Sequence, residues 1–213
     1  VNDPVNALPT LCSERARARA REQDFFTLPL AGIPIAIKDL LTVSGVRTTF
    51  GSMAYRDHVP KASDLLVERI EAAGGIVYAK SNTPEFGAGA NTFNDVFGFT
   101  RNPWNTALSA AGSSGGSAVA LATGMAWLAT GSDLGGSLRN PASFCSIVGF
   151  RPSQGRIAAP TRRLPRTTST RARSTGSEAV ACAACTPRSA FCARGANCTP
   201  CMSSEGSCNR NSS

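Results

Sequence analysis

The chain has 213 residues, of which 42% are hydrophobic and 17% charged, a balance typical of a globular protein rather than a disordered one. It has no apolar run long enough to span a bilayer and no signal-peptide pattern at its N-terminus, so we expect a cytoplasmic protein that does not bind a membrane. Residues 1–159 hold 14 basic and 12 acidic residues (+2), whereas residues 160–213 hold eight arginines and two glutamates (+6). The basic character therefore belongs to the tail, and we expect no nucleic-acid partner.

The first predicted elements are a helix from about Thr10 to Glu22 and a short strand within PLAGIPIAIKDLLTV. The alternation of isoleucine in that strand places Ile33, Ile35 and Ile37 on one face. Lys38 ends the strand and lies on the opposite face.

A second helix, DLLVERIEAAGG, has its apolar residues at helical spacing, with Ser63 as a candidate cap. The buried strand IVYAK follows it. The stretch TPEFGAGANTFNDVFGFTRNPWN is too rich in glycine, asparagine and proline for a regular element and predicts a long loop, which is often functional.

Further along, SAVALATG predicts a helix, MAWLATG a strand, and LRNPASFCSIVGF a helix that ends in an apolar strand. Alternating strands and helices predict an α/β fold with a mixed, largely parallel sheet that helices cover on both faces. After about Leu164 the pattern stops, and large apolar residues almost disappear.

Two glycine-rich loops carry serines: AAGSSGGSAVALATG at 110–124 and TGSDLGGSLRNP at 130–141. Neither has the lysine of a P-loop, and neither is a dinucleotide-binding fingerprint, so no cofactor is expected. Each loop taken alone is also compatible with a structural turn in which serine caps a helix.

A serine nucleophile needs a base, and the usual base is histidine. The single histidine, His58, lies in the polar stretch YRDHVPKASD, which has the composition of a surface loop. A Ser-Lys arrangement is the other option, and it requires a lysine that is held neutral. Lys38 is the candidate because it directly follows the apolar run IPIAI.

The combination of GIPIAIKD, GSSGGSA and GSDLGGSLRNP resembles the amidase signature family. Lys38 precedes Ser113 by 75 residues, and Ser113 precedes Ser137 by 24, an order and spacing similar to the family's lysine, bridging serine and nucleophilic serine. TRNPWN and FCSIVGFRPSQGRI are also similar to family segments, and the likeness covers about residues 2–160.

The resemblance implies an amidase that cleaves a small-molecule carboxylic amide through an acyl-enzyme. Ser137 is then the nucleophile, Ser113 the relay on a cis peptide bond, and Lys38, neutral at rest, the final proton acceptor. The backbone N–H groups of Leu134, Gly135, Gly136 and Ser137 would form the oxyanion hole.

Other residues have supporting roles in this interpretation. Ser114 supports the hydrogen-bond network, Asp133 and Arg139 brace the nucleophile loop, and the long loop near Gly87 touches the substrate. No metal is expected at the site, and the sequence does not determine the oligomeric state.

The chain also departs from the family pattern. Ala111 and Ser146 stand where glycine is usual, and the C-terminal half that completes the sheet and much of the substrate pocket in the family is missing. We therefore expect a partial catalytic domain over residues 1–160 and a disordered Arg/Ser/Cys-rich tail over 161–213, typical of a gene read out of frame.

Three alternatives stay open. The chain is a non-catalytic remnant, or it is the A subunit of a glutamyl-tRNA amidotransferase, which uses the same serines and lysine together with partner subunits. The TPEFGAGANTF loop favours a stand-alone amidase over that amidotransferase. The third alternative is a zinc-binding tail, because CAAC at 182–185 and CTPC at 198–201 are two C-x-x-C pairs.

Overall fold

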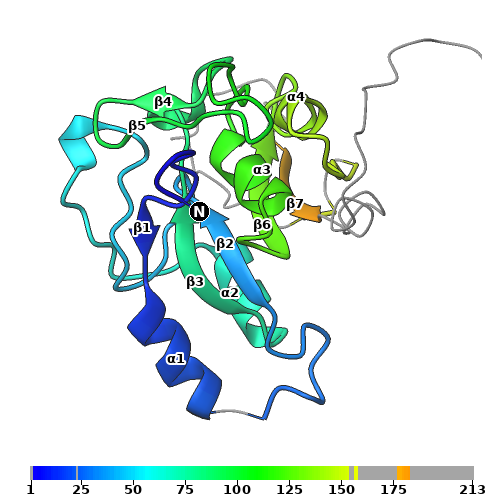
Figure 1. Ribbon diagram of the computed structural model, residues 1–213. Coiled ribbons are helices and arrows are strands. Elements are labelled where there is room, and N and C mark those ends of the chain that lie inside the picture. The colour runs from blue at the N-terminus through cyan, green and yellow to red at the C-terminus, as the bar shows by residue number, and fades with distance from the viewer. Residues whose placement is uncertain (1, 23, 154–155, 158–176, 183–213) are drawn as a thin grey trace, which may run out of the picture.

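The computed structural model describes residues 2–22, 24–153, 156–157 and 177–182, the last of these as backbone only (Figure 1). A five-stranded sheet in the order β1-β3-β2-β6-β7 forms the centre of the fold. Its strands are β1 (Thr10–Leu11), β2 (Pro34–Lys38), β3 (Ile76–Ser81), β6 (Leu128–Asp133) and β7 (Ser177–Cys182).

The three inner strands, β3, β2 and β6, run parallel, and the two edge strands, β1 and β7, pair with them antiparallel. The predicted mixed, largely parallel sheet is confirmed. The register of β2 on β3 shifts between Ile35 and Ala36, which leaves Tyr78 as an extra residue on β3. Such a bulge re-aims the side chains that follow it.

The remaining elements surround this sheet. The α-helices are α1 (Ser13–Glu22), α2 (Leu65–Ala72), α3 (Gly115–Ala122) and α4 (Arg139–Phe144). Two short 3-10 helices, η1 (Met53–Tyr55) and η2 (Glu85–Gly87), and a small hairpin of β4 (Phe93–Asn94) and β5 (Gly98–Phe99) complete the described part.

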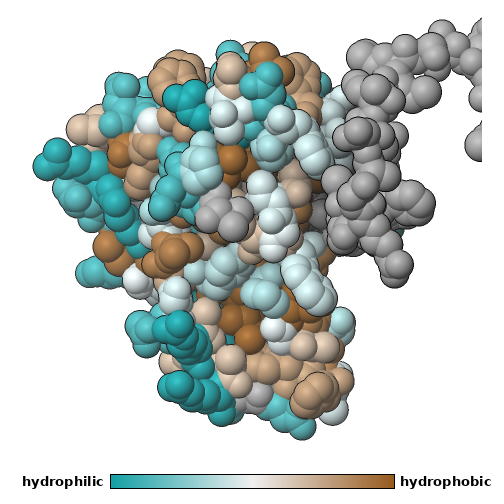
Figure 2. Space-filling model, in the orientation of Figure 1, coloured by the Kyte–Doolittle hydropathy of each residue, from teal (hydrophilic) through white to brown (hydrophobic). Residues whose placement is uncertain are grey.

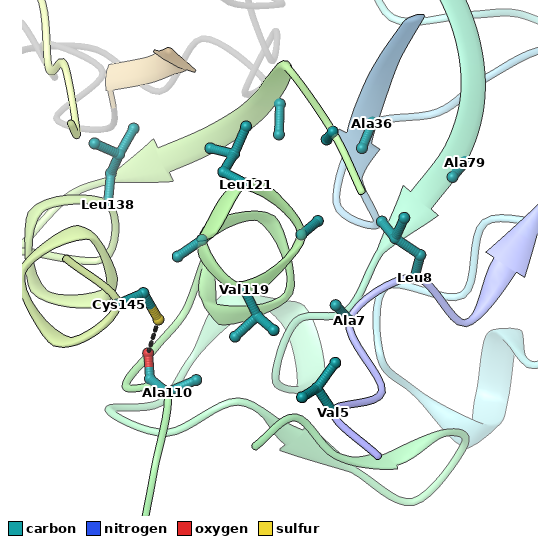
Figure 3. Packing of buried hydrophobic residues seen from close by; sticks show 14 residues of the cluster. Val5, Ala7, Leu8, Ala36, Ala79, Ala110, Val119, Leu121, Leu138 and Cys145 are labelled. Atoms are coloured by element: carbon teal, nitrogen blue, oxygen red, sulfur yellow. Dashed lines mark hydrogen bonds between the residues drawn. The ribbon is translucent and has the colours of Figure 1, made fainter. Parts of the chain in front are cut away.

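Helices cover both faces of the sheet, because alternate strand residues enter two different cores. On one face Ala36, Ala79 and Ala129 pack against the helix α3. Figure 3 shows this core around α3, with Val119 and Leu121 on the helix and Leu138 at the start of α4. On the other face Ile35, Ile37 and Val77 pack against Leu66, Val67 and Ile70 of α2.

Small residues on the α3 face allow a close approach. All of Gly115–Leu121 is buried, and the strands beneath present mainly alanine. A Cβ at Gly116 would lie 2.6 Å from the carbonyl oxygen of Asn82, at the end of β3, so a larger residue would push the helix away. This contact brings the start of α3, where the first serine loop ends, directly onto the end of β3.

Several predicted boundaries were wrong. Thr10 and Leu11 form β1 and the helix starts only at Ser13, because the backbone of β1 pairs with β3. The N-cap of α2 is Asp64, while the Ser63 hydroxyl accepts a hydrogen bond from Ser44 N (2.9 Å). Residues 147–150 form no strand, and β7 rather than this segment pairs with the edge of β6.

The tail also differs from the expectation in one place. Residues 177–182 form β7 along the outer edge of β6 (Figure 1), although the sequence pattern predicted no regular element there. The pairing supplies hydrogen-bond partners for the edge of β6, which would otherwise be open. The rest of the predicted tail, including the second C-x-x-C pair, lies outside the described residues.

The described part of the chain holds no helix long and apolar enough to cross a membrane.

Candidate active site

Lys38 lies at the carboxyl end of β2, buried on the α3 face as the alternation predicted, with only 1% of its surface exposed. Its Nζ is 2.7 Å from Ser113 Oγ, 2.9 Å from Ser114 Oγ and 2.9 Å from Ser132 Oγ. The side chain therefore ends inside a set of three hydroxyl groups that come from the two serine loops.

The backbone of Lys38 is held as well. Its N–H donates to Thr130 Oγ1 at 2.7 Å, beyond the last paired residues of β2 and β6. A side-chain hydroxyl thus replaces the carbonyl acceptor where the parallel ladder stops. The two strands part at this point, and the serines occupy the space beside the Lys38 side chain.

Ser113 is buried in the loop before α3, and the peptide bond between Gly112 and Ser113 is cis, as the resemblance implied. Ala111, which stands where the family has glycine, adopts a positive φ of 57°. The position therefore keeps a backbone conformation that glycine adopts more readily.

Ser137 lies in the loop between β6 and α4 and is partly exposed. Its carbonyl oxygen accepts a hydrogen bond from Ser114 N at 2.9 Å, which joins the two serine loops. Within the described residues the Ser137 hydroxyl makes no hydrogen bond. The structure thus brings Lys38 and Ser113 into direct contact, while the Ser113–Ser137 step of the predicted relay stays a prediction.

Ser114 and Ser132 complete the surroundings of Lys38. The Ser114 hydroxyl accepts from Ser132 N at 3.2 Å, in addition to its contact with Lys38. Ser132 was missed from the sequence, although it lies in the quoted loop, two positions after the residue that binds the Lys38 backbone. The feature that could have identified Ser132 is a hydroxyl residue near the end of the strand next to Lys38. Recognising it requires knowing which strands are neighbours in the sheet.

The predicted oxyanion donors divide into two groups. The Gly136 N–H donates to Asp133 Oδ1 at 2.8 Å, so in this structure it is engaged within the loop, and its predicted role in the oxyanion hole stays a prediction. The N–H groups of Leu134, Gly135 and Ser137 make no hydrogen bond among the described residues. Both Leu134 and Gly135 are exposed residues, so a ligand is able to approach this part of the loop.

The two glycines of this loop are needed for different reasons. Gly136 has a φ of +117°, and a Cβ there would lie 2.8 Å from Asn140 Nδ2. A Cβ at Gly135 would meet nothing within 4 Å in the described structure. Backbone conformation and packing explain glycine at 136, whereas the open space at 135 leaves the backbone approachable from outside.

Asp133 braces the loop that carries Ser137 from inside. Its buried carboxylate accepts hydrogen bonds from the N–H groups of Gly136, Leu138 and Arg139, and from Arg139 Nε and Nη2. Arg151 Nε donates to the Asp133 carbonyl oxygen at 3.1 Å. Burial raises the pKa of Asp133, but the bonds from the Arg139 side chain and from the loop N–H groups outweigh it and hold that pKa well below its usual range.

The long loop that contains Gly87 lies beside a groove of about 310 Å³. The groove is lined by Gly51, Met53, Pro84, Glu85, Ala88, Gly89, Ala90, Asn91, Phe93, Asn94 and Asp95. Gly87 itself has a φ of +69° and packs against Leu40, and it is not among the residues that line the groove. Its predicted contact with substrate stays a prediction.

His58 takes no part in the site. It is exposed, stacks on Phe50 and meets the ring of Tyr55 edge-on. Among the described residues no cluster of His, Cys, Asp and Glu has the geometry to hold a metal ion. The cysteine pairs proposed for zinc fall outside those residues, except for the backbone of Cys182.

Comparison with known proteins agrees with this geometry. The model of the amidase family matches residues 1–174, which extends the likeness beyond the predicted limit at residue 160. The chain belongs to the amidase signature family.

Among the curated relatives of this amidase-family chain is the A subunit of the glutamyl-tRNA(Gln) amidotransferase of Synechococcus sp. strain CC9605, 45% identical over 72% of this chain and 33% of the relative. A similar protein from Roseiflexus sp. strain RS-1 is 44% identical over 74% of this chain and 34% of its own length. The chain thus spans about a third of the length of the curated relatives it matches.

Solved structures show the same fold. A 6-aminohexanoate cyclic dimer hydrolase bound to its substrate superposes with a TM-score of 0.72 at 33% identity, over 86% of this chain and 37% of that chain. The A subunit of the glutamyl-tRNA(Gln) amidotransferase of Thermotoga maritima superposes with a TM-score of 0.60 at 36% identity, over 71% and 32% of the two chains.

Proposed function

We propose that the protein containing this chain cleaves carboxylic amides, with Ser137 as nucleophile, Ser113 as proton relay and Lys38 as the base. The observation that carries the proposal is the 2.7 Å contact between Lys38 Nζ and Ser113 Oγ inside a buried, hydroxyl-lined space. Membership of the amidase signature family supports the reaction class.

The surroundings of Lys38 suit a neutral amine. An uncharged amine has two N–H donors and one lone pair, so one of its three hydroxyl neighbours donates to it. In the proposed mechanism Ser113, whose Oγ is the nearest of the three to Lys38 Nζ, takes the donor role.

In the first half of the proposed reaction, Ser137 Oγ bonds to the amide carbon while its proton passes to Ser113 Oγ, and the proton of Ser113 passes to Lys38 Nζ. The N–H groups of Leu134, Gly135 and Ser137 are the candidates to bind the resulting oxyanion, and such a donor contributes about 3 kcal/mol. The proton then returns through Ser113 to the leaving nitrogen, and the C–N bond breaks. Water releases the acyl group from Ser137 by the same relay.

A fluorophosphonate probe tests this assignment, because it labels activated serines without knowledge of the substrate. We expect labelling of the full chain at Ser137, its loss in Ser137→Ala, and a decrease of about 10²-fold or more in Ser113→Ala and Lys38→Ala. Ser44→Ala is the control, since that hydroxyl binds Lys61 O far along the chain from both serine loops. Labelling that persists in Ser137→Ala would reject the nucleophile.

A second candidate function is that of the A subunit in a glutamyl-tRNA(Gln) amidotransferase. The curated relatives at 44–45% identity favour it, although the TPEFGAGANTF loop predicted a stand-alone amidase. In this case the chain would belong to an assembly and the amide would be glutamine. Copurification of partner subunits or tRNA with the tagged protein, together with release of ammonia from glutamine, supports this function; hydrolysis of simple amides by the purified protein alone contradicts it.

A further inference from the structure

The segment 82–92, which follows β3, packs against the loop that carries Ser113. A Cβ at Gly112 would lie 2.7 Å from Gly89 O and 2.9 Å from the carbonyl carbon of Ala90. A Cβ at Gly115 would overlap the side chain of Thr92. The two segments therefore meet closely, without room for a methyl group, on both sides of Ser113.

Thr83 supplies a hydrogen bond on one side of this contact. Its hydroxyl donates to the carbonyl oxygen of Ser113 at 3.1 Å, and the residue is fully buried. Thr83 is itself fixed, because its N–H donates to Asn82 Oδ1 and its carbonyl accepts from Asn94 Nδ2. A rigid hydrogen-bond donor thus holds the carbonyl group of Ser113 itself.

Thr92 acts on the other side. Its hydroxyl donates to Ala111 O at 2.8 Å and accepts from Gly115 N at 3.1 Å. The residue is 2% exposed. The backbone is therefore held two residues before Ser113 and two residues after it by one hydroxyl group.

We infer that Thr83 and Thr92 are positioning residues that hold the Ser113 hydroxyl within reach of Lys38. The inference rests on the proposed function, in which Ser113 passes a proton between Lys38 and Ser137. A valine has nearly the shape of threonine, so packing alone does not require hydroxyl groups at these two sites. Proton transfer is sensitive to small displacements, and a misplacement of about 1 Å costs about 10²-fold in rate.

The test compares Thr83→Val with Thr83→Ser in the full chain, and Thr92→Val with Thr92→Ser. The measured quantity is the second-order rate constant for fluorophosphonate labelling of Ser137. We expect each valine variant to lose about tenfold or more, and each serine variant to stay within about threefold of the wild type, because serine keeps the hydroxyl.

Thr123→Val is the matched control. Thr123 also donates its hydroxyl to a main-chain carbonyl, that of Val119 at 2.7 Å, but at the far end of α3. We expect its labelling rate to equal that of the wild type. A thermal melt of every variant ensures that rates are compared below the unfolding transition, and the Thr92 pair gives the same test if Thr83→Val does not fold.

The outcomes separate the inference from the function on which it rests. If Ser113→Ala labels slowly, the relay stands. In that case, wild-type labelling rates in the valine variants, or equal losses of rate in the valine and serine variants, would overturn the positioning role. If Ser113→Ala labels as fast as the wild type, the relay itself is wrong, and the proposed function fails with it.

Discussion

Lys38 and Lys80 are two buried lysines on neighbouring strands of one sheet, but they point to opposite faces and have different hydrogen-bond partners. Lys38 points to the α3 face, where three serine hydroxyls surround its Nζ. Lys80 pairs in register with Ile37 and points to the α2 face, where its Nζ donates to Asp39 Oδ1 at 2.8 Å, Leu41 O at 2.7 Å and Thr48 Oγ1 at 2.8 Å.

The acceptors decide what each lysine does. A carboxylate, a carbonyl and a hydroxyl around Lys80 match the three N–H donors of an ammonium. Burial lowers the pKa of Lys80, and the Asp39 carboxylate acts in the opposite direction. Hydroxyls both donate and accept, so the hydrogen bonds around Lys38 reverse without a change of geometry. The comparison supports a structural role for Lys80 on one face and is consistent with the proton-transfer role proposed for Lys38 on the other.

The Asp39–Lys80 pair has a structural task that fits this division. The Asp39 carboxylate accepts from Thr49 N at 3.0 Å and from Thr49 Oγ1 at 2.6 Å. The N–H of Gly51 in turn donates to Thr49 Oγ1. The pair therefore anchors the segment that follows β2 to the sheet. This segment continues to Gly51, which lines the groove beside the long loop.

Replacing each lysine with methionine is the strongest way to break the comparison. Lys80→Met leaves the Asp39 carboxylate buried without its cation, and we expect the free energy of unfolding to fall by about 3–5 kcal/mol. Among the described residues, Lys38→Met leaves hydroxyls that are able to bond one another, so we expect a stability loss below about 1.5 kcal/mol and loss of fluorophosphonate labelling.

Urea unfolding measures the first quantity and mass-spectrometric labelling the second. The double variant Lys80→Met with Asp39→Leu serves as a control, since it removes both charges and should recover part of the stability. Equal stability losses in the two single variants would contradict the division of roles between the faces.

A second buried carboxylate, Asp133, extends the comparison to the α3 face. We expect Asp133→Asn to cost about 3 kcal/mol at pH 7, because the amide cannot satisfy the five N–H groups that the carboxylate binds. The pKa of Asp133 is lower in the folded chain than in the unfolded one. Its stabilisation is therefore complete above the unfolded pKa of about 3.9 and is lost as the pH falls below it.

Chemical unfolding of wild type and Asp133→Asn between pH 6 and pH 2.5 checks the sign. The difference in free energy of unfolding should stay constant down to about pH 4 and then shrink. A difference that grows as the pH falls would mean that Asp133 is not held as a carboxylate by the loop.

The smallest expected effect compares Gly135 and Gly136, the adjacent glycines of the loop that carries Ser137. Gly136→Ala introduces a side chain at a φ of +117° and against Asn140, and we expect it to destabilise the protein by about 1–3 kcal/mol. Gly135→Ala has open space and should change stability by less than about 1 kcal/mol. Thermal melts measure both, and equal shifts would contradict the assigned packing.

The surface of the protein differs in hydropathy from one region to another. The helix α1, which the SERARARARE sequence forms, presents a hydrophilic surface (Figure 2). By contrast, Trp127 next to β6 and Phe144 of α4 are 67% and 55% exposed. The surface of α1 is thus polar, whereas apolar residues remain accessible next to β6 and in α4.

The sequence was most informative where a motif and a periodicity agreed. The isoleucine alternation placed Lys38 on the face opposite to Ile37, and the two serine loops are next to that face, as expected. The parallel sheet with helices on both faces also followed from the order of the elements. Boundaries were less accurate, as at Thr10–Leu11, where pairing with β3 overrides the helical pattern.

Residues that act through long-range contacts were not predictable. Ser132, Thr83 and Thr92 are ordinary hydroxyl residues in sequence, and only the fold brings them to Lys38 and to the Ser113 loop. Lys80 has the same polar neighbours along the chain as a surface lysine, yet it is fully buried. The use of the Gly136 N–H by Asp133 likewise depends on the shape of a loop.

The sequence by itself therefore determined the inner strands and most of the helices, the side of the sheet on which Lys38 lies, and the family. Local spacing is sufficient for this, because strand alternation and helix periodicity depend on neighbours along the chain. Only the tertiary structure decided which hydroxyls surround Lys38, which carboxylate neutralises Lys80, and which loop holds Ser113. These are contacts between residues 30–95 positions apart, and their geometry follows from strand order and packing rather than from any local pattern.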